Sequence, residues 1–145
     1  MLKFYDSEST LVAGPLHGYV DGVSGGVYDL VLWVRNDDTG FVYTDVYVQY
    51  LEDGSTTCMT ELNTVAGLGI VVKMAKSTKP TEIMWAALPP ASSIQLEDIG
   101  IIGETNTPDT ASYQPVYVRI YCPAGTPTQI MRDHSLRIIA TPIGV

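Results

Sequence analysis

Apolar and polar residues alternate with a period of two along most of this 145-residue chain. Such alternation is typical of β-strands that bury one face and expose the other. The first clear run covers residues 27–35 and ends in a cluster of turn-forming Asn, Asp, Thr and Gly at 36–40. The second run covers 44–50. These two segments are predicted to be strands, joined either as a hairpin or as the crossing between the two sheets of a sandwich.

Similar runs continue towards the C-terminus, at 67–76, 81–88, 92–100, 114–121 and 135–141. Helical periodicity is almost missing, although the segment 55–68 fits either a short helix or a loop. The chain is therefore predicted to be an all-β protein, an antiparallel β-sandwich of about seven or eight short strands.

The whole chain, 1–145, is expected to form a single domain. Pro, Gly and Ser are scattered along it instead of being concentrated in a linker. Residues 1–26 are expected to form an N-terminal arm or β-hairpin followed by a glycine-rich crossing, and residues 27–145 the sandwich core. A chain of this length can bury roughly 68% of the surface that it exposes when unfolded, which is enough for a core without disulfide staples.

Acidic residues outnumber basic ones by 16 to 8, which gives a formal net charge of −8. Lys and Arg form no cluster, so the phosphate neutralisation on which nucleic-acid binding depends is not expected. An anionic membrane surface is disfavoured for the same reason. Asp6 and Glu8 interrupt the N-terminal region where a secretory signal needs an apolar run, and no run approaches the roughly 18 apolar residues of a membrane helix. Synthesis in the cytoplasm is therefore expected.

Few residues in the sequence suggest catalysis. The histidines are His17 and His134, and the second lies between Asp133 and Ser135. Adjacent residues of a strand or turn point apart, whereas a catalytic triad is assembled from distant positions. No catalytic residue is therefore predicted, and the chain is expected not to be an enzyme.

Metal and cofactor sites are not predicted either. Neither HExxH nor paired CxxC spacing occurs. The acidic pairs at 37–38, 52–53 and 97–98 lack EF-hand spacing, so turn formation and solubility are favoured over a calcium site. Reduced thiols are the default for Cys58 and Cys122, with one disulfide as the alternative.

Five segments carry a family resemblance: "LVLWVRNDD", "TDVYVQY", "SSIQLEDIG", "QPVYVRIYCPAGTP" and "LRIIATP". They resemble the immunoglobulin-like β-sandwich modules that occur in bacterial surface proteins, glycoside hydrolases and tailed-phage virions. The resemblance covers about half of the chain and implies a single immunoglobulin-like sandwich. It also implies which residues fill the core: Leu30, Leu32, Val34, Val46, Val48, Tyr50, Val116, Val118, Ile120, Leu136, Ile138 and Ala140.

Because secreted modules of this kind carry a signal and phage modules need none, the resemblance favours a virion protein such as a capsid decoration or accessory protein. Its expected partners are the major capsid protein or other virion subunits, with homo-oligomerisation. The resemblance also places Tyr47, Tyr117, Arg119 and Tyr121 together on the outer surface of one sheet.

Tyr and Arg are enriched at protein interfaces, although tyrosine also has a high intrinsic strand propensity. The expected interface residues are Tyr47, Tyr117, Arg119, Tyr121, Trp33, Phe4 and Tyr5. The alternative is a carbohydrate-binding or adhesive module, in which Trp33 and Trp85 would stack on sugars. Because Trp85 lies in the apolar run 83–90, a place in the core or an interface is favoured for it.

Overall fold

The computed structural model describes residues 1–8, 10–12, 23–51, 71–101, 112–125 and 135–145. These residues form seven strands and one short helix: β1 (Leu2–Tyr5), β2 (Gly26–Asn36), β3 (Phe41–Leu51), β4 (Val71–Lys76), α1 (Glu82–Ala87), β5 (Ser93–Gln95), β6 (Tyr113–Cys122) and β7 (Ser135–Gly144). All strand pairs are antiparallel. The predicted all-β sandwich is thus confirmed.

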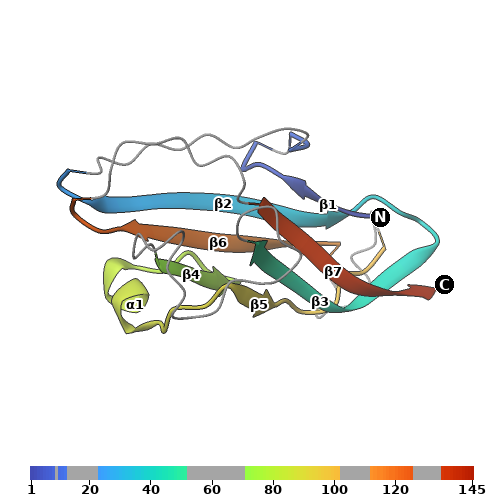
Figure 1. The fold of residues 1–145 in the computed structure, drawn as a ribbon. Coiled ribbons are helices and arrows are strands. Elements are labelled where there is room, and N and C mark those ends of the chain that lie inside the picture. The colour runs from blue at the N-terminus through green and yellow to red at the C-terminus, as the bar shows by residue number, and fades with distance from the viewer. Residues whose placement is uncertain (9, 13–22, 52–70, 102–111, 126–134) are drawn as a thin grey trace.

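The strands form a four-stranded sheet of order β1-β2-β6-β4, here sheet A, and a three-stranded sheet of order β5-β3-β7, here sheet B. Both termini lie at one end of the molecule, and α1 lies near the other end (Figure 1). β2 belongs to sheet A and β3 to sheet B. Of the two predicted connections between them, the structure therefore has the crossing and not the hairpin.

The crossing is held by Asn36, which is 1% exposed. Its side-chain N–H groups donate to the carbonyl oxygens of Phe41 and Gly100 at 2.8 and 2.9 Å, and its Oδ1 accepts from the backbone N–H of Asp38. A buried amide is stable only when such partners satisfy it. Asn36 therefore ties the turn to the segment that follows β5.

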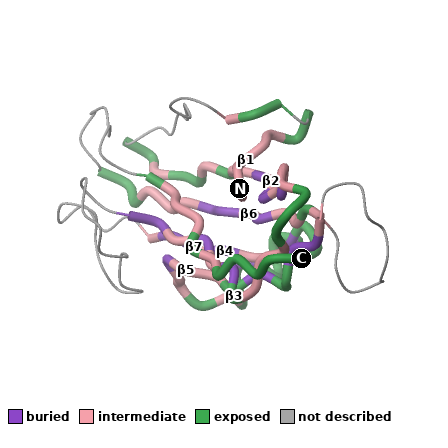
Figure 2. Tube along the Cα trace, turned by 90° about the vertical axis from the view of Figure 1, so that its right-hand side faces the viewer, coloured by how far each residue is buried: buried purple, intermediate pink, exposed green. Residues whose placement is uncertain are grey.

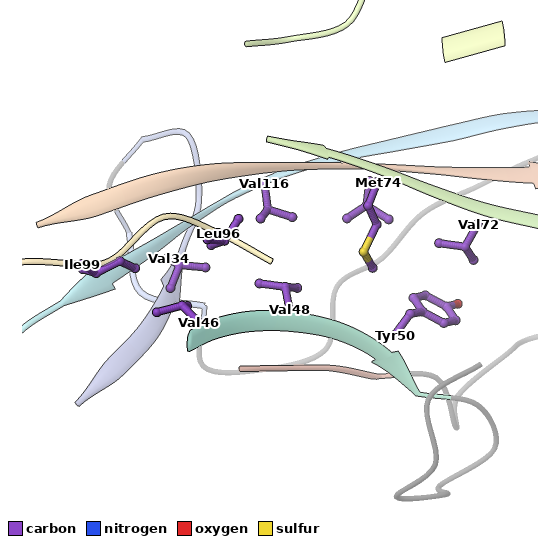
Figure 3. Packing of buried hydrophobic residues seen from close by; sticks show 10 residues of the cluster. Val34, Val46, Val48, Tyr50, Val72, Met74, Leu96, Ile99 and Val116 are labelled. Atoms are coloured by element: carbon purple, nitrogen blue, oxygen red, sulfur yellow. The ribbon is translucent and has the colours of Figure 1, made fainter. Parts of the chain in front are cut away.

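The predicted core is confirmed. Seven of its residues are buried and the rest pack partly buried beside them, joined by Val72, Met74, Leu96 and Ile99. The side chains of Val116 and Met74 point from sheet A towards Val48 and Tyr50 of sheet B (Figure 3). Burial of each such side chain stabilises the fold by roughly 1.5–3 kcal/mol.

A β-bulge corrects the phase of β3. Thr44 pairs with Thr141 and Tyr47 with Ile139, so three steps on β3 correspond to two steps on β7. Asp45 occupies the bulge with a φ of 48°. Because of the extra residue, Tyr43 before the bulge and Val46, Val48 and Tyr50 after it all face the core.

One predicted strand is a helix. Residues 81–88 were expected to continue the alternation, but α1 forms there. The hydroxyl of Thr81 caps it by accepting from the N–H of Met84 at 3.3 Å, and Glu82 lies in the first turn. Val72 accepts from the N–H of Ala91, so the chain returns beside β4.

The N-terminal segment combines the predicted arm and hairpin. β1 pairs with β2, and Leu2 and Phe4 pack against the core. The chain then turns back, because Val12 donates its N–H to the carbonyl of Phe4 and Tyr5 forms a bridge with Leu11. The glycine-rich segment 13–22, the segment 55–68, both histidines and Cys58 lie outside the described residues, whereas the thiol of Cys122 is free.

The sheet order explains one wrong prediction. The second and the penultimate strand segments were expected to belong to one sheet, but β3 belongs to sheet B and β6 to sheet A. Tyr47 of β3 and Tyr117 of β6 consequently lie on different sheets.

Candidate partner interface

The outer face of sheet A carries most of the predicted interface residues. The strand register aligns them in rows: Tyr5 lies opposite Trp33, Arg35 opposite Tyr113, and Tyr117 opposite Val31. Tyr121 continues the face next to Val27. Side chains in such rows contact one another across the strands. Tyr5, Trp33, Tyr117 and Tyr121 are thus brought to one surface.

Four of these residues, Tyr5, Trp33, Arg35 and Tyr113, form what we call the aromatic patch. The rings of Trp33 and Tyr113 meet edge to face, with centroids 5.4 Å apart and an interplanar angle of 66°. The guanidinium carbon of Arg35 lies 4.6 Å from the centre of the Tyr5 ring. Tyr113 is 50% exposed. The patch therefore combines a cation with open aromatic surface, the composition of interface hot spots.

Arg35 has no carboxylate within ion-pair distance among the described residues. Other cations of this region are neutralised: Lys3, opposite Arg35 on β1, pairs with Asp37. Lys73, Lys79 and Arg137, like Arg35, have no carboxylate at this distance among the described residues. The patch therefore has a local positive charge that a carboxylate from outside could neutralise.

Arg119 is not part of an open interface, contrary to expectation. It lies on the outer side of sheet A, yet only 5% of the residue is exposed because α1 covers it. Its guanidinium donates to Asp29 at 2.7 and 2.8 Å and to Glu82 of α1 at 2.6 and 2.8 Å. Its guanidinium carbon lies 5.0 Å from the centre of the Trp85 ring. We call these four residues the Arg119 clamp.

The clamp holds α1 on the sheet. The bidentate hydrogen bonds to Glu82 and Asp29 raise the pKa of Arg119, and the same bond to Arg119 lowers the pKa of Glu82. Lys73 adds a second tether, donating to the backbone carbonyl of Trp85 at 3.0 Å. α1 therefore covers one end of the outer face and leaves the aromatic patch open at the other.

Two further expectations about individual residues are wrong, those for Phe4 and Tyr47, whereas Trp85 is buried as its apolar run favours. Phe4 packs against the core and not on the surface, because its position on β1 places it opposite Val34. Tyr47 lies on the outer face of sheet B, next to Gln95 and Ile139. Trp85 is only 3% exposed, so the sugar platform of two tryptophans does not form.

Two residues of the aromatic patch, Arg35 and Tyr113, were not among the predicted interface residues. Both lie on the same strand face as a predicted interface residue. Arg35 follows Trp33 by two positions, and Tyr113 precedes Tyr117 by four. Extending the alternation outward to the strand ends would have identified them. Asp29 and Glu82 had no such signal, because their role depends on the pairing of distant segments and on α1.

Among the described residues, no three His, Cys, Asp or Glu side chains gather where they could hold a metal ion. The described helix is too short to cross a membrane. Comparison of the chain with known protein families, curated proteins and solved structures found no match. The interpretation of function therefore depends on the geometry of the outer face.

Proposed function

We propose that this chain is a non-enzymatic structural protein of a virus particle, an accessory or decoration protein that docks on the major capsid protein or another subunit of a tailed-phage virion. The supporting observation is the aromatic patch: partly exposed rings, and a guanidinium that has no carboxylate partner among the described residues, displayed on a four-stranded sheet. A packed sandwich keeps such residues in place, so little side-chain entropy is lost on docking. On a repetitive lattice, many weak contacts of this kind hold firmly.

The patch also indicates the chemistry of the partner. The docking surface should offer a carboxylate to Arg35 and a flat apolar surface to Trp33 and Tyr113. Complementary charge increases the association rate and selects the partner, while the buried rings supply most of the affinity.

Particles purified from a phage that encodes the chain test this proposal. We expect quantitative mass spectrometry to find the chain in them. A copy number comparable with that of the major capsid protein would indicate decoration of the head, and a few copies would indicate the tail or baseplate. Particles that lack the chain would contradict the proposal.

Tyr113→Ala tests the surface itself, with Tyr47→Ala as the matched control on the opposite sheet. Loss of a hot-spot side chain weakens binding by about thirtyfold or more, because about 2 kcal/mol is lost. We expect Tyr113→Ala to weaken particle binding to this extent with little change in melting temperature, and Tyr47→Ala to leave binding unchanged. Equal effects of both variants would show that docking does not use the outer face of sheet A.

A carbohydrate-binding module is the second candidate, favoured by the half-exposed ring of Tyr113 and the partly exposed ring of Trp33 beside it. Aromatic faces of this kind also stack on sugars. A glycan array with a bound sugar whose signal disappears in Trp33→Ala would support this function, and an array without binding would exclude it for the glycans displayed.

A further inference from the structure

The four edges of the two sheets are protected to different degrees. β1 is four residues long, and its outer edge accepts the N–H of Val12 at Phe4. β4 accepts the N–H of Ala91 at Val72, and β5 is only three residues long. β7 is ten residues long and forms the edge of sheet B. A long edge strand with unpaired backbone groups is a template for another strand, which proteins usually block.

The hydrogen-bond pattern identifies the groups of β7 that face outward. Val145 donates its N–H to Gly40, whereas Tyr43 directs its backbone groups away from β7 to Ile99, and Tyr50 directs its N–H to Ser92. Successive residues of an antiparallel strand direct their backbone groups alternately towards one neighbouring strand and away from it. These contacts therefore show which residues of β7 direct their backbone groups towards β3. The even-numbered residues of β7 therefore point their backbone N–H and C=O groups away from β3. The described residues provide no partner for these groups at Leu136, Ile138 and Ala140.

The side chains of this edge are nearly neutral. Arg137 is the one charged residue of β7. Leu136, Ile138 and Ala140 pack against the core but stay partly exposed, and Ile139, on the outer face, is 41% exposed. The far end of β7, near the C-terminus, is exposed (Figure 2). A neutral, apolar strip on a molecule of net charge −8 is where two copies can approach with the least repulsion.

We propose that two copies of this chain associate by antiparallel pairing of their β7 strands about a two-fold axis at Ile138. In this register Leu136 of one copy lies opposite Ala140 of the other, so every outward N–H of these three residues meets a carbonyl. Sheet B becomes continuous across the dimer, and the open sides of the two cores face each other.

We infer that the strand that pairs with β7 is the β7 of a second copy, because residues 136–140 are self-complementary in this register. The apolar residues meet apolar residues, and Arg137 lies opposite Ile139 of the other copy and not opposite a second Arg137. Pro142, which has no N–H to offer at the free edge, lies beyond the paired segment. An isologous contact of this kind closes after two subunits and does not extend into a fibre.

A pair of substitutions at Ile139 tests the register. Ile139→Lys places a cation opposite Arg137 of the other copy, and Ile139→Glu places an anion there. Both remove the same apolar side chain. With two such pairs in the dimer, we expect sedimentation equilibrium to give a dissociation constant about tenfold higher for the Lys variant than for the Glu variant.

General charge repulsion predicts the reverse order, because the Glu variant is the more negative. A Lys variant that dimerises as tightly as the Glu variant, or a wild-type chain that stays monomeric at high concentration, would overturn the proposal. Ala140→Pro, which removes an outward N–H that β3 does not use, should abolish the dimer and leave the monomer folded. These measurements use the purified chain alone, so their outcome is independent of docking through the aromatic patch.

Discussion

At the scale of single residues, Arg119 shows how a charged side chain is buried on the outer side of a sheet. Only 6% of the side chain is exposed, and two carboxylates and the ring of Trp85 surround it. Removal of a buried guanidinium from water is costly unless hydrogen bonds compensate it. The two carboxylates remain in contact with solvent, since the side chains of Asp29 and Glu82 are 47% and 82% exposed. The clamp thus buries one charge and leaves the other two hydrated.

This asymmetry predicts unequal effects of neutralising the two acids. Asp29→Asn should lower the free energy of unfolding by about 1–2 kcal/mol, because the less exposed carboxylate contributes more to compensating Arg119. Glu82→Gln should lower the free energy of unfolding less than Asp29→Asn does, as expected for an exposed ion pair. Urea unfolding followed by circular dichroism measures both. A larger loss for Glu82→Gln would mean that α1 supplies the main counter-charge.

At the scale of elements, the bulge of β3 accommodates a break in the alternation, because the core-facing residues Tyr43 and Val46 are three positions apart and not two. Asp45 has a positive φ of 48°, a conformation that Asp tolerates better than most residues and that β-branched residues avoid. Without the extra residue, Tyr43 and Val46 would face opposite sides. The bulge therefore lets Tyr43 before it and Val46 after it both face the core.

Substitutions at Asp45 should depend on backbone conformation alone, because this residue is exposed. Asp45→Val should lower the free energy of unfolding by about 1–2 kcal/mol, and Asp45→Gly should change it by less than about 0.5 kcal/mol. Thermal unfolding of the two variants beside the wild type measures the difference. Equal stabilities would show that the bulge relaxes or that β3 shifts its register.

The elements were predictable where alternation is long and unpredictable where contacts between distant segments decide. Leu30 to Val34 and Val116 to Ile120 keep a strict period of two, so β2 and β6 and their core faces were predicted. α1 was not, because six residues with one buried side chain, Trp85, show no helical period. The sheet that each strand joins also has no local signal, and so Tyr47 was assigned to the wrong sheet.

At the scale of the whole molecule, acid should weaken the fold at three carboxylates. The hydrogen bond from Lys3 lowers the pKa of Asp37, and that from the backbone N–H of Gly40 lowers the pKa of Asp38. The bond from Arg119 lowers the pKa of Glu82 from its ordinary value of 4.5. A group whose pKa is lower in the folded than in the unfolded state stabilises the fold above its ordinary pKa. That stabilisation is lost as the pH falls through the lowered value.

The free energy of unfolding should therefore be nearly constant between about pH 7 and pH 5 and fall below about pH 4.5. Lys3→Met removes the donor that lowers the pKa of Asp37, so the variant should lose less stability on acidification than the wild type. Urea titrations at a series of pH values measure both curves. Parallel curves for the two proteins would show that Lys3 does not lower the pKa of Asp37 in solution.

The pairing of β2 with β6 has a consequence for how the chain folds. Asp29 and Arg119, which face each other across these strands, are 90 residues apart in sequence. Sheet A therefore cannot close during synthesis until β6 has left the ribosome, and a large loop must be ordered before the first contact between these strands is gained. Slow, late closure of this kind leaves the apolar strands exposed for longer in the nascent chain, which makes chaperone assistance important for its yield.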